Sequence, residues 1–444
     1  MSFNPLPILL TAVGIYFLVR LRFFFIVHPV RTLRKMANAI RSHNAFSSLM
    51  LALAGTLGVG NIFGVCIGII VGGVGSIFWL FISCVFSSVI KYCEVLLTHD
   101  HIFSCSEGNR GGMSYVIRNS FSGRLSIFWK IYAALCILLS LIMGAALQCG
   151  TVVESVTDLA SVPPIFVSAT ISTLVVVALI GGSSLIKKIT TFVIPMSTII
   201  YIILTLMIIL KNLSSVPDMI LLIISDAFRI ESGLGGIIGF LGCKAIREGY
   251  SRGILSNEAG SGTSGIAHAD SGILNPANAA LMGIAEVVFD TGFMCMLTAW
   301  AVILSVPNPT DFTGGMSLIL TAFSTSLSPT ASYMLVFLTF IYAYSTVICW
   351  YHYGVESIYA LFGRESKYIY LLIFTFACVA LSVIGNRPLI YLTDIVILLM
   401  SVITLLTLIK NSDRIVFLSE KGGILNRRIK ENGFLKELKF HSRK

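Results

Sequence analysis

The chain has 444 residues, of which 56% are hydrophobic and only 12% are charged, about half the roughly 25% of charged residues usual for soluble domains. A soluble protein of this size could not bury so much apolar surface, so the composition excludes an ordinary soluble enzyme, a disordered chain and a disulfide scaffold. It predicts an all-α polytopic membrane protein. The formal net charge of +10 does not indicate nucleic-acid binding, because the basic residues follow membrane topology.

Eleven apolar stretches are long enough to cross about 30 Å of hydrocarbon, which takes about 20 helical residues. We expect helices in all of them, because a backbone exposed to lipid must satisfy its own hydrogen bonds. The first has no basic segment before it and no small-residue cleavage site, so we expect a retained span. In chain order, the predicted limits are 6–27, 46–71, 75–98, 130–150, 164–182, 190–210, 233–248, 278–305, 331–353, 368–386 and 388–409.

The placement of lysine and arginine predicts the orientation of these spans. With the C-terminus in the cytoplasm and the N-terminus external, all but three of the 31 Lys and Arg residues lie in cytoplasmic regions or at the inner ends of spans. The three exceptions are Lys211, Arg229 and Arg387. The long connection 306–330 has no Lys or Arg, as expected of an external loop in the plasma (inner) membrane. The basic tail 411–444 should be solvated or face anionic lipid.

Glycine is concentrated in the second stretch, within LAGTLGVGNIFGV. Gly60, Gly64, Gly68 and Gly72 recur every four residues, which lines one face of a helix and permits close helix packing. Gly55 and Gly58 precede this ladder, so packing does not explain them. Because glycine weakens a helix by roughly 1 kcal/mol relative to alanine, we expect the helix to break at this point.

A second glycine-rich run, GLGGIIGFLGC, begins at Gly233 in the seventh stretch and predicts a second broken helix. After the extra N-terminal segment 1–45, the chain then divides into two sets of five spans, 46–215 and 216–410, each beginning with a broken helix. Five is odd, so the two sets have opposite orientations in the membrane. Interrupted helices at corresponding positions of inverted repeats indicate a transporter binding site, although chance register of two glycine-rich spans is the alternative.

A helix that unwinds in mid-membrane exposes amides that suit a carboxylate and carbonyls that suit a cation. The string TLGVGN, Thr56 to Asn61, offers both. Asn61 adds a neutral oxygen that can join a cation shell, and an interhelical hydrogen bond is its alternative role.

Further polar residues lie deep in apolar stretches: Gln148, Ser345, Thr346 and Trp350, together with Asp290 and Glu286. An ionisable group inside a membrane is a functional candidate, although we favour structural pairing for Asp290. Lys91 and Glu94 are three residues apart near a cytoplasmic helix end, and we expect a surface pair.

No set of catalytic residues is recognisable. Gly58-Val59-Gly60 is not a dinucleotide fingerprint, because there is no βαβ context. His268 and Asp270 have no nucleophile or metal partner at a useful spacing, and we expect neither an enzyme nor a bound cofactor.

The chain resembles the sodium/alanine symporter family, also called alanine/glycine:cation symporters. The blocks that carry the resemblance are LAGTLGVGNIFGVCIGIIVGGVGSIFW (53–79), GYSRGILSNEAGSGTSGIAHA (249–269), FDT (289–291), Gln148 and STVICWYHYGVE (345–356). The resemblance implies a leucine-transporter-type fold, a five-plus-five inverted repeat with one extra N-terminal helix.

The resemblance also implies site residues. The amides around Val59 and Gly60, with Asn61, would hold the substrate carboxylate of alanine or glycine. Gln148, Thr346 and Trp350 would line the pocket, and Gly239 and Phe240 of the seventh stretch would close it. The implied sodium ligands are Ala54, Leu57, Asn61, Ser345 and Thr346. The family's TVGTGN is TLGVGN here, which removes hydroxyls at positions 57 and 59 and bears on substrate preference.

The sequence thus predicts a symporter that imports a small neutral amino acid with sodium. Two alternatives remain at this point. One is proton coupling, with Asp290 or Glu286 as the carrier, and the other is a membrane sensor that binds an amino acid without transporting it.

Overall fold

The computed structural model describes residues 5–41, 43–105, 108–180, 182–229, 243–269 and 273–425. In this part of the chain the backbone is almost entirely helical, with one short antiparallel hairpin of β1 (Phe103–Cys105) and β2 (Gly108–Arg110). The predicted all-α architecture is confirmed.

Each predicted span outside 233–248 coincides with a helix or with consecutive helices. They are α1 (Leu6–Arg20), α4 (His43–Thr56) with α5 (Phe63–Gly72), α6 (Ser76–Asp100), α8 (Phe128–Leu139) with η3 (Ser140–Leu147) and α9 (Gln148–Thr157), α10 (Pro164–Ile180), α11 (Gly182–Lys211), α16 (Pro276–Val287) with η5 (Val288–Cys295) and α17 (Met296–Ser305), α19 (Pro329–Phe362), α20 (Lys367–Phe376) with η8 (Ala377–Leu381), and α21 (Asn386–Lys410).

Length and composition give a smaller number of spans than eleven. Among the described residues, six helical segments are long and apolar enough to cross a membrane, and the bent pair α4–α5 makes a seventh. The helices α1, α10 and α18 (Gly315–Ser326) are apolar but shorter. The count of eleven therefore stays a prediction.

The first predicted span, 6–27, is not one continuous helix. Helix α1 ends at Arg20, and Arg22 and Phe23 adopt positive φ angles of 55° and 51° before the short α2 (Phe24–Val27). Left-handed backbone at two adjacent non-glycine residues ends the helix, and apolar composition alone did not indicate that turn.

Short helices that the hydropathy pattern did not predict connect the long ones. They are α3 (Pro29–Ala39), α7 (Met113–Ser120), α12 (Val216–Ala227), α14 (Lys244–Asn257), α15 (Ser264–His268), α18 and α22 (Ser412–Lys421), together with single turns η1 (Val59–Asn61), η2 (Gly123–Ile127), η4 (Leu213–Ser215), η6 (Pro309–Asp311) and η7 (Arg364–Ser366).

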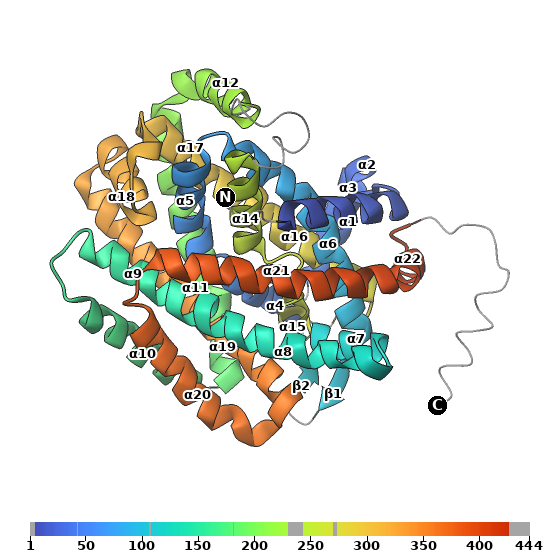
Figure 1. The fold of residues 1–444 in the computed structure, drawn as a ribbon. Coiled ribbons are helices and arrows are strands. Elements are labelled where there is room, and N and C mark those ends of the chain that lie inside the picture. The colour runs from blue at the N-terminus through green and yellow to red at the C-terminus, as the bar shows by residue number, and fades with distance from the viewer. Residues whose placement is uncertain are drawn as a thin grey trace.

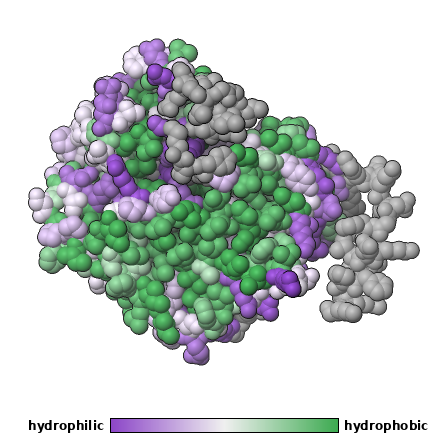
Figure 2. All heavy atoms as spheres, viewed as in Figure 1, coloured by the Kyte–Doolittle hydropathy of each residue, from purple (hydrophilic) through white to green (hydrophobic). Residues whose placement is uncertain are grey.

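The surface has the pattern of a membrane protein. Figure 2 shows a broad hydrophobic band across the molecule, with hydrophilic residues gathered toward the α12 and α18 side and toward the α7 and α22 side. Large apolar side chains such as Phe192, Leu372 and Phe376 are exposed in this protein. In water such a surface would aggregate, and in lipid it needs no partner.

The interior is organised around α6, which packs against α1, α14 and α16 (Figure 1). The glycine ladder of α5 packs on α14, as the four-residue spacing predicted. A Cβ at Gly64 would lie 3.4 Å from Leu255, one at Gly68 would lie 3.0 Å from Arg252, and one at Gly72 would lie 2.8 Å from Glu248. The two helices therefore lie side by side along their whole contact, with the α5–α6 turn at the same end as Glu248.

Candidate functional site

The predicted break in the second span is present. Helix α4 ends at Thr56, Gly58 is extended with φ −113° and ψ −155°, and Val59–Asn61 forms one 3-10 turn before α5 begins. The two half-helices are bent by 58°. The N–H groups of this turn lie at the positive end of the α5 dipole, and the last carbonyl groups of α4 lie at the negative end of the α4 dipole. The break therefore presents N–H groups that suit an anion and carbonyl groups that suit a cation.

Two side chains from distant helices meet the break. The Thr346 hydroxyl of α19 donates a hydrogen bond to the Ala54 carbonyl oxygen at 2.8 Å, and the Val59 N–H donates to Gln148 Oε1 at 3.2 Å. Both approach Gly58 closely, because a Cβ there would lie 2.8 Å from Thr346 Oγ1 and 2.9 Å from Gln148 Oε1. Glycine at 58 is therefore required by close approach.

A small pocket opens at the break, with room on the order of one water molecule. The predicted residues Val59, Gly60 and Gln148 line it. Further lining residues come from the broken helix, from η3 and from α14, and they are Gly55, Thr56, Gly58, Phe63, Met143, Leu147 and Leu255. No side chain in this lining is charged.

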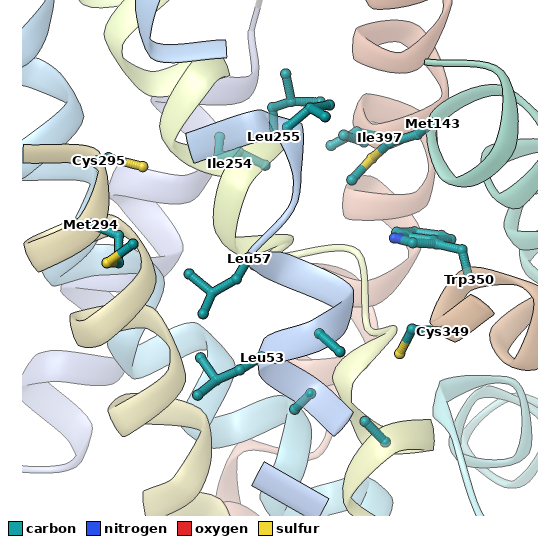
Figure 3. Close-up of a cluster of buried hydrophobic side chains, with 14 of the residues drawn as sticks. Leu53, Leu57, Met143, Ile254, Leu255, Met294, Cys295, Cys349, Trp350 and Ile397 are labelled. Carbon is teal, nitrogen blue, oxygen red and sulfur yellow. The ribbon is translucent and has the colours of Figure 1, made fainter. Parts of the chain in front are cut away.

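Other predicted site residues lie behind the pocket wall. Thr346 does not line the pocket. Its side chain lies against Gly58, which forms the pocket wall at this point. Trp350 is fully buried and packs against Gly144 of η3, next to Met143 in Figure 3. Leu57, at the end of α4, points away from Trp350 toward Met294. Ser345 donates within its own helix, to the Ile341 and Tyr342 carbonyls at 3.0 and 2.9 Å.

Asn61 belongs to a separate, fully buried polar cluster. Its amide Nδ2 donates to Asp290 Oδ1 at 2.7 Å and lies 3.0 Å from Ser256 Oγ. Asp290 Oδ2 accepts from Ser256 at 2.6 Å and from Thr291 at 2.8 Å. Within the described part of the chain, no Lys, Arg or His forms an ion pair with Asp290, and Asn61 Oδ1 has no hydrogen-bond partner. The interhelical hydrogen bond and the structural pairing considered for these residues are thus both present.

Both Gln148 and Asp290 adjoin π-helical turns. Gln148 directly follows η3, and Asp290 lies within η5. Such turns are rare and are frequently found at functional sites, because the extra residue in the turn redirects the neighbouring side chains. Sequence reasoning had no signal for them.

A second helix break is present in the described residues, on the C-terminal side of the run in which one is predicted. Gly239 and Phe240 fall outside the described residues. In the described residues that follow, α14 continues from Lys244 to Asn257 and ends at Glu258, which has a left-handed φ of 57°. Gly260 and Gly262 also have positive φ, and α15 begins at Ser264. The break thus falls in the SNEAGSG string, whose two glycines allow left-handed backbone.

This position changes the predicted topology around α14. The predicted seventh span, 233–248, ends in the cytoplasm, so we expect Lys244, Arg247 and Glu248 at a cytoplasmic helix end. The structure places Arg252 against Gly68 and the start of α14 beside the α5–α6 turn, whereas the predicted topology puts this turn and the end of the seventh span on opposite sides of the membrane. Arg252 is buried and pairs with Asp394 of α21 at 2.6 Å and with Glu248 at 3.6 Å.

The predicted surface pair of Lys91 and Glu94 is also wrong. Both side chains are fully buried against the second break. Lys91 Nζ donates to the Asn257 carbonyl oxygen at 2.6 Å and lies 3.3 Å from Glu286, which also contacts His268 at 3.2 Å. A spacing of three residues places two side chains on one helix face, but only tertiary packing decides whether that face is buried.

Sequence reasoning missed Ser256 and Met143 as site residues. The string SNEAG was recognisable only as a family motif, and the glycines that follow it were the available signal for a break. Met143 and Leu147 had no signal, because an apolar residue in an apolar helix looks the same whether it faces lipid or a pocket.

Comparisons with known proteins show which family the chain is similar to. The profile of the sodium:alanine symporter family matches residues 1–419. An uncharacterized transporter of Haemophilus influenzae is 31% identical over 378 residues, covering 83% of this chain and 82% of its own. The sodium/alanine symporter AgcS of Methanococcus maripaludis is 29% identical, and the alignment covers 83% of this chain and 83% of AgcS. The probable sodium/glutamine symporter GlnT of Bacillus subtilis is 28% identical, and the alignment covers 84% of this chain and 79% of GlnT.

Among solved structures, a Na⁺-coupled sialic acid symporter in a substrate-bound, outward-open state matches with a TM-score of 0.53. The alignment covers 93% of this chain and 86% of that one at 12% identity, so the likeness shows the fold alone. The family and these relatives are transporters and not enzymes. The chain is an integral multi-pass membrane protein that couples amino-acid transport to a cation, and it belongs to the sodium:alanine symporter family.

Proposed function

We propose that this protein imports a small neutral amino acid, alanine or glycine, together with sodium, by alternating access. The observation that carries the proposal is the Asp290 carboxylate. It is wholly buried against Asn61 in the turn of the broken helix, among neutral donors and without a basic partner in the described part of the chain.

The substrate carboxylate would bind at the start of α5. The turn Val59–Asn61 presents backbone N–H groups at the positive end of that half-helix, which favours an anion. Gln148 Oε1 already accepts from the Val59 N–H, so substrate binding would exchange one acceptor for another. In this proposal Val59, Gly60 and Asn61 hold the substrate through the backbone N–H groups of this turn, and Gln148 holds it through its side chain.

The pocket wall favours a small and uncharged side chain. Phe63, Met143, Leu147 and Leu255 are apolar, and the space is smaller than an amino acid. The walls must therefore separate before a substrate enters, and each additional methylene of the substrate requires more separation. Thr346 and Trp350 would set the size of the pocket from behind Gly58 and Gly144. Gly239 and Phe240 remain proposed closing residues.

Sodium is carried with the substrate, and two sets of oxygen atoms fit it. The first comprises Asn61, Ser256 and Asp290, where Asn61 Oδ1 is buried with no hydrogen-bond partner among the described residues and Asp290 supplies negative charge. Burying a carboxylate without a cation is costly, so a cation at this position offsets its charge. The second comprises the carbonyls of Ala54 and Leu57 with the hydroxyls of Ser345 and Thr346, of which only the Ala54–Thr346 contact is already made.

Coupling to one sodium ion would supply enough free energy for accumulation. One charge crossing about 100 mV gains about 2.3 kcal/mol, which corresponds to roughly 50-fold accumulation before the ion gradient is counted.

Alternating access would come from the two broken helices and the pair of repeats, residues 46–215 and 216–410. With the N-terminus external and the C-terminus cytoplasmic, the Arg252–Asp394 pair lies on the external side of the pocket and links α14 to α21. Separation of these two helices would open the external path, and movement of α4 would open the cytoplasmic one.

The experiment is uptake of radiolabelled alanine into proteoliposomes, with and without a sodium gradient, for the parent protein and for Asp290→Asn and Thr346→Val. We expect sodium-driven uptake in the parent, and a loss of at least tenfold in apparent sodium affinity for Asp290→Asn, because hydrogen-bonded charges contribute roughly 1.5–3 kcal/mol. Asp311→Asn, in the exposed loop after α17, is the matched control and should behave as the parent.

The outcomes separate the candidate functions. If only Thr346→Val loses the sodium dependence of uptake, the sodium site lies at the end of α4 and not at Asp290. Uptake that persists without sodium and collapses with a protonophore would replace sodium coupling with proton coupling, a function that the buried Asp290 also suits. Binding of alanine without any flux would replace transport with sensing.

A further inference from the structure

The segment after α1 forms a short amphipathic element that the proposed transport site does not use. Helix α1 ends at Arg20, and the left-handed turn at Arg22 and Phe23 leads the chain into α2 and α3. In Figure 1 both helices lie beside α1. Thr32 and Met36 of α3 lie one turn apart and are buried, and α3 packs against α16. The remaining sides of α3 therefore face away from the protein.

One exposed side of this segment is apolar. Val30 and Leu33 lie three residues apart on α3, and 69% and 63% of their surfaces are exposed. Three further large apolar residues before them are also exposed: Phe23, Ile26 and Val27. They continue along the chain from Ile15 and Val19, which are exposed apolar side chains of α1. Since the hydrophobic surface of a membrane protein contacts lipid, this continuity indicates that the apolar side of α2 and α3 contacts lipid as well.

Another exposed side of α3 is basic. Arg31, Arg34 and Lys35 have the three- and four-residue spacings that place side chains together on one side of a helix. Arg31 and Lys35 donate to the Gly423 carbonyl oxygen at 3.1 and 2.7 Å, a neutral acceptor that leaves both positive charges uncompensated. Arg34, and Arg41 just after α3, are exposed and form no ion pair among the described residues.

The chain itself supplies little negative charge to this side of α3. Asp413 of α22 already pairs with Arg20, and Glu420 lies 3.5 Å from Arg22. Residues 426–444 contain seven Lys and Arg residues and only two Glu residues, so their net charge has the same sign as that of α3. A partner for the basic side of α3 must therefore be anionic and come from outside the chain.

We propose that α2 and α3 lie in the interface of the membrane leaflet at this end of the protein and bind anionic phospholipid there. The exposed apolar side chains between Phe23 and Leu33 enter the outer part of the acyl-chain layer. The four basic side chains of α3 and Arg41 contact the lipid phosphates. An apolar side next to a basic side is the arrangement by which a helix binds in the plane of an anionic membrane. In the predicted topology this leaflet is the cytoplasmic one.

Fluorescence quenching tests the lipid contact at α3 itself. Cys105 and Cys243 are replaced by serine, and the full-length Leu33→Cys variant is labelled with bimane and placed in phosphatidylcholine vesicles. Part of the lipid is then replaced by brominated phosphatidylglycerol or by the same amount of brominated phosphatidylcholine. We expect quenching by both lipids, because their bromine atoms lie on the acyl chains. We expect stronger quenching by phosphatidylglycerol, because its negative headgroup is concentrated at the basic side of α3.

Neutral variants separate headgroup recognition from apolar contact. In labelled protein that also carries Arg34→Gln and Arg41→Gln, we expect the affinity for phosphatidylglycerol relative to phosphatidylcholine to fall by at least about fivefold, the effect of one basic residue near an anionic surface. Lys211→Gln with Arg229→Gln is the matched control, because these two exposed basic residues flank α12, away from α3. The control should keep the preference of the parent.

Absence of quenching by both lipids would show that water, residues 426–444 or a second copy of the chain covers the apolar side, and it overturns the proposal. Equal quenching by the two lipids in the parent also overturns it, and so does a preference that survives Arg34→Gln with Arg41→Gln. If that variant does not fold, the parent decides. Its preference must disappear at high salt, which screens exposed charges, and a preference that remains counts against the proposal. The measurement needs no uptake, so its result does not depend on the proposed function.

Discussion

The two glycines of the first break differ in whether they leave room for a side chain. Gly58 and Gly60 belong to the same GVG string, and the sequence gives no reason to rank them. The structure does, because Gly58 meets side chains from α19 and from the turn after η3, whereas Gly60 meets only the backbone of α14 at ordinary distances.

We expect Gly58→Ala to abolish uptake and Gly60→Ala to retain it. The new Cβ at position 58 would lie 2.8 Å from Thr346 Oγ1 and 2.9 Å from Gln148 Oε1, and must displace both groups that hold the break. At position 60 the nearest atom would be Ser256 Cα at 3.4 Å, an ordinary contact. Alanine uptake normalised to the amount of inserted protein measures the difference. Equal uptake by the two variants would contradict the assigned role of Gly58.

At the scale of elements, the packing of α5 on α14 unites the two broken helices. The glycines of α5 bring its backbone close to α14, so the polar cluster of Asn61 and Ser256 forms across the contact. The contact is tighter at its outer end than in its middle, since the Cβ distance falls from 3.4 Å at Gly64 to 2.8 Å at Gly72.

We therefore expect Gly72→Ala to lower the thermal unfolding midpoint and Gly64→Ala to leave it nearly unchanged. Overpacking a tight contact costs roughly 1–3 kcal/mol, and at Gly72 the obstructing atom is the Glu248 Cβ, which cannot swing away. Differential scanning fluorimetry in detergent compares the two variants with the parent. A larger loss for Gly64→Ala would mean that the helices pack in another register.

At the scale of the whole molecule, the hydrophobic band and the ion pairs at one end of the protein bear on its orientation in the membrane. Arg20 of α1 pairs with Asp413 of α22, and Arg414 pairs with Asp100 at the end of α6. These contacts gather the ends of three helices on the side that the basic residues predict to be cytoplasmic.

Cysteine labelling tests this orientation. In a background with Cys105 and Cys243 replaced by serine, we expect Asp311→Cys to react with a membrane-impermeant maleimide in intact cells. Glu365→Cys should react only after permeabilisation, because η6 and η7 are exposed on opposite sides in the predicted topology. The remaining cysteines of the described chain are buried and should not react with the maleimide. The reverse labelling pattern would invert the topology and the direction of every path described above.

The sequence by itself determined the class of protein, the positions of the apolar helices and the break at Gly58, because these depend on local composition and on the conformational cost of glycine. It also identified Asn61, Gln148 and Thr346 as polar residues in apolar helices. It did not indicate the break at 258–263, because the glycines at 260 and 262 lie outside the apolar stretches, and the break expected within 233–243 stays a prediction.

Only the tertiary structure decided which polar residues meet. Asn61 pairs with Asp290, 229 residues away, and Lys91 reaches Asn257 and Glu286 from a helix face that the sequence assigned to the surface. The physical reason is that an α-helix fixes which residues share a face but not what covers that face. The partners of buried charges follow from helix packing, which arises between segments far apart in the chain.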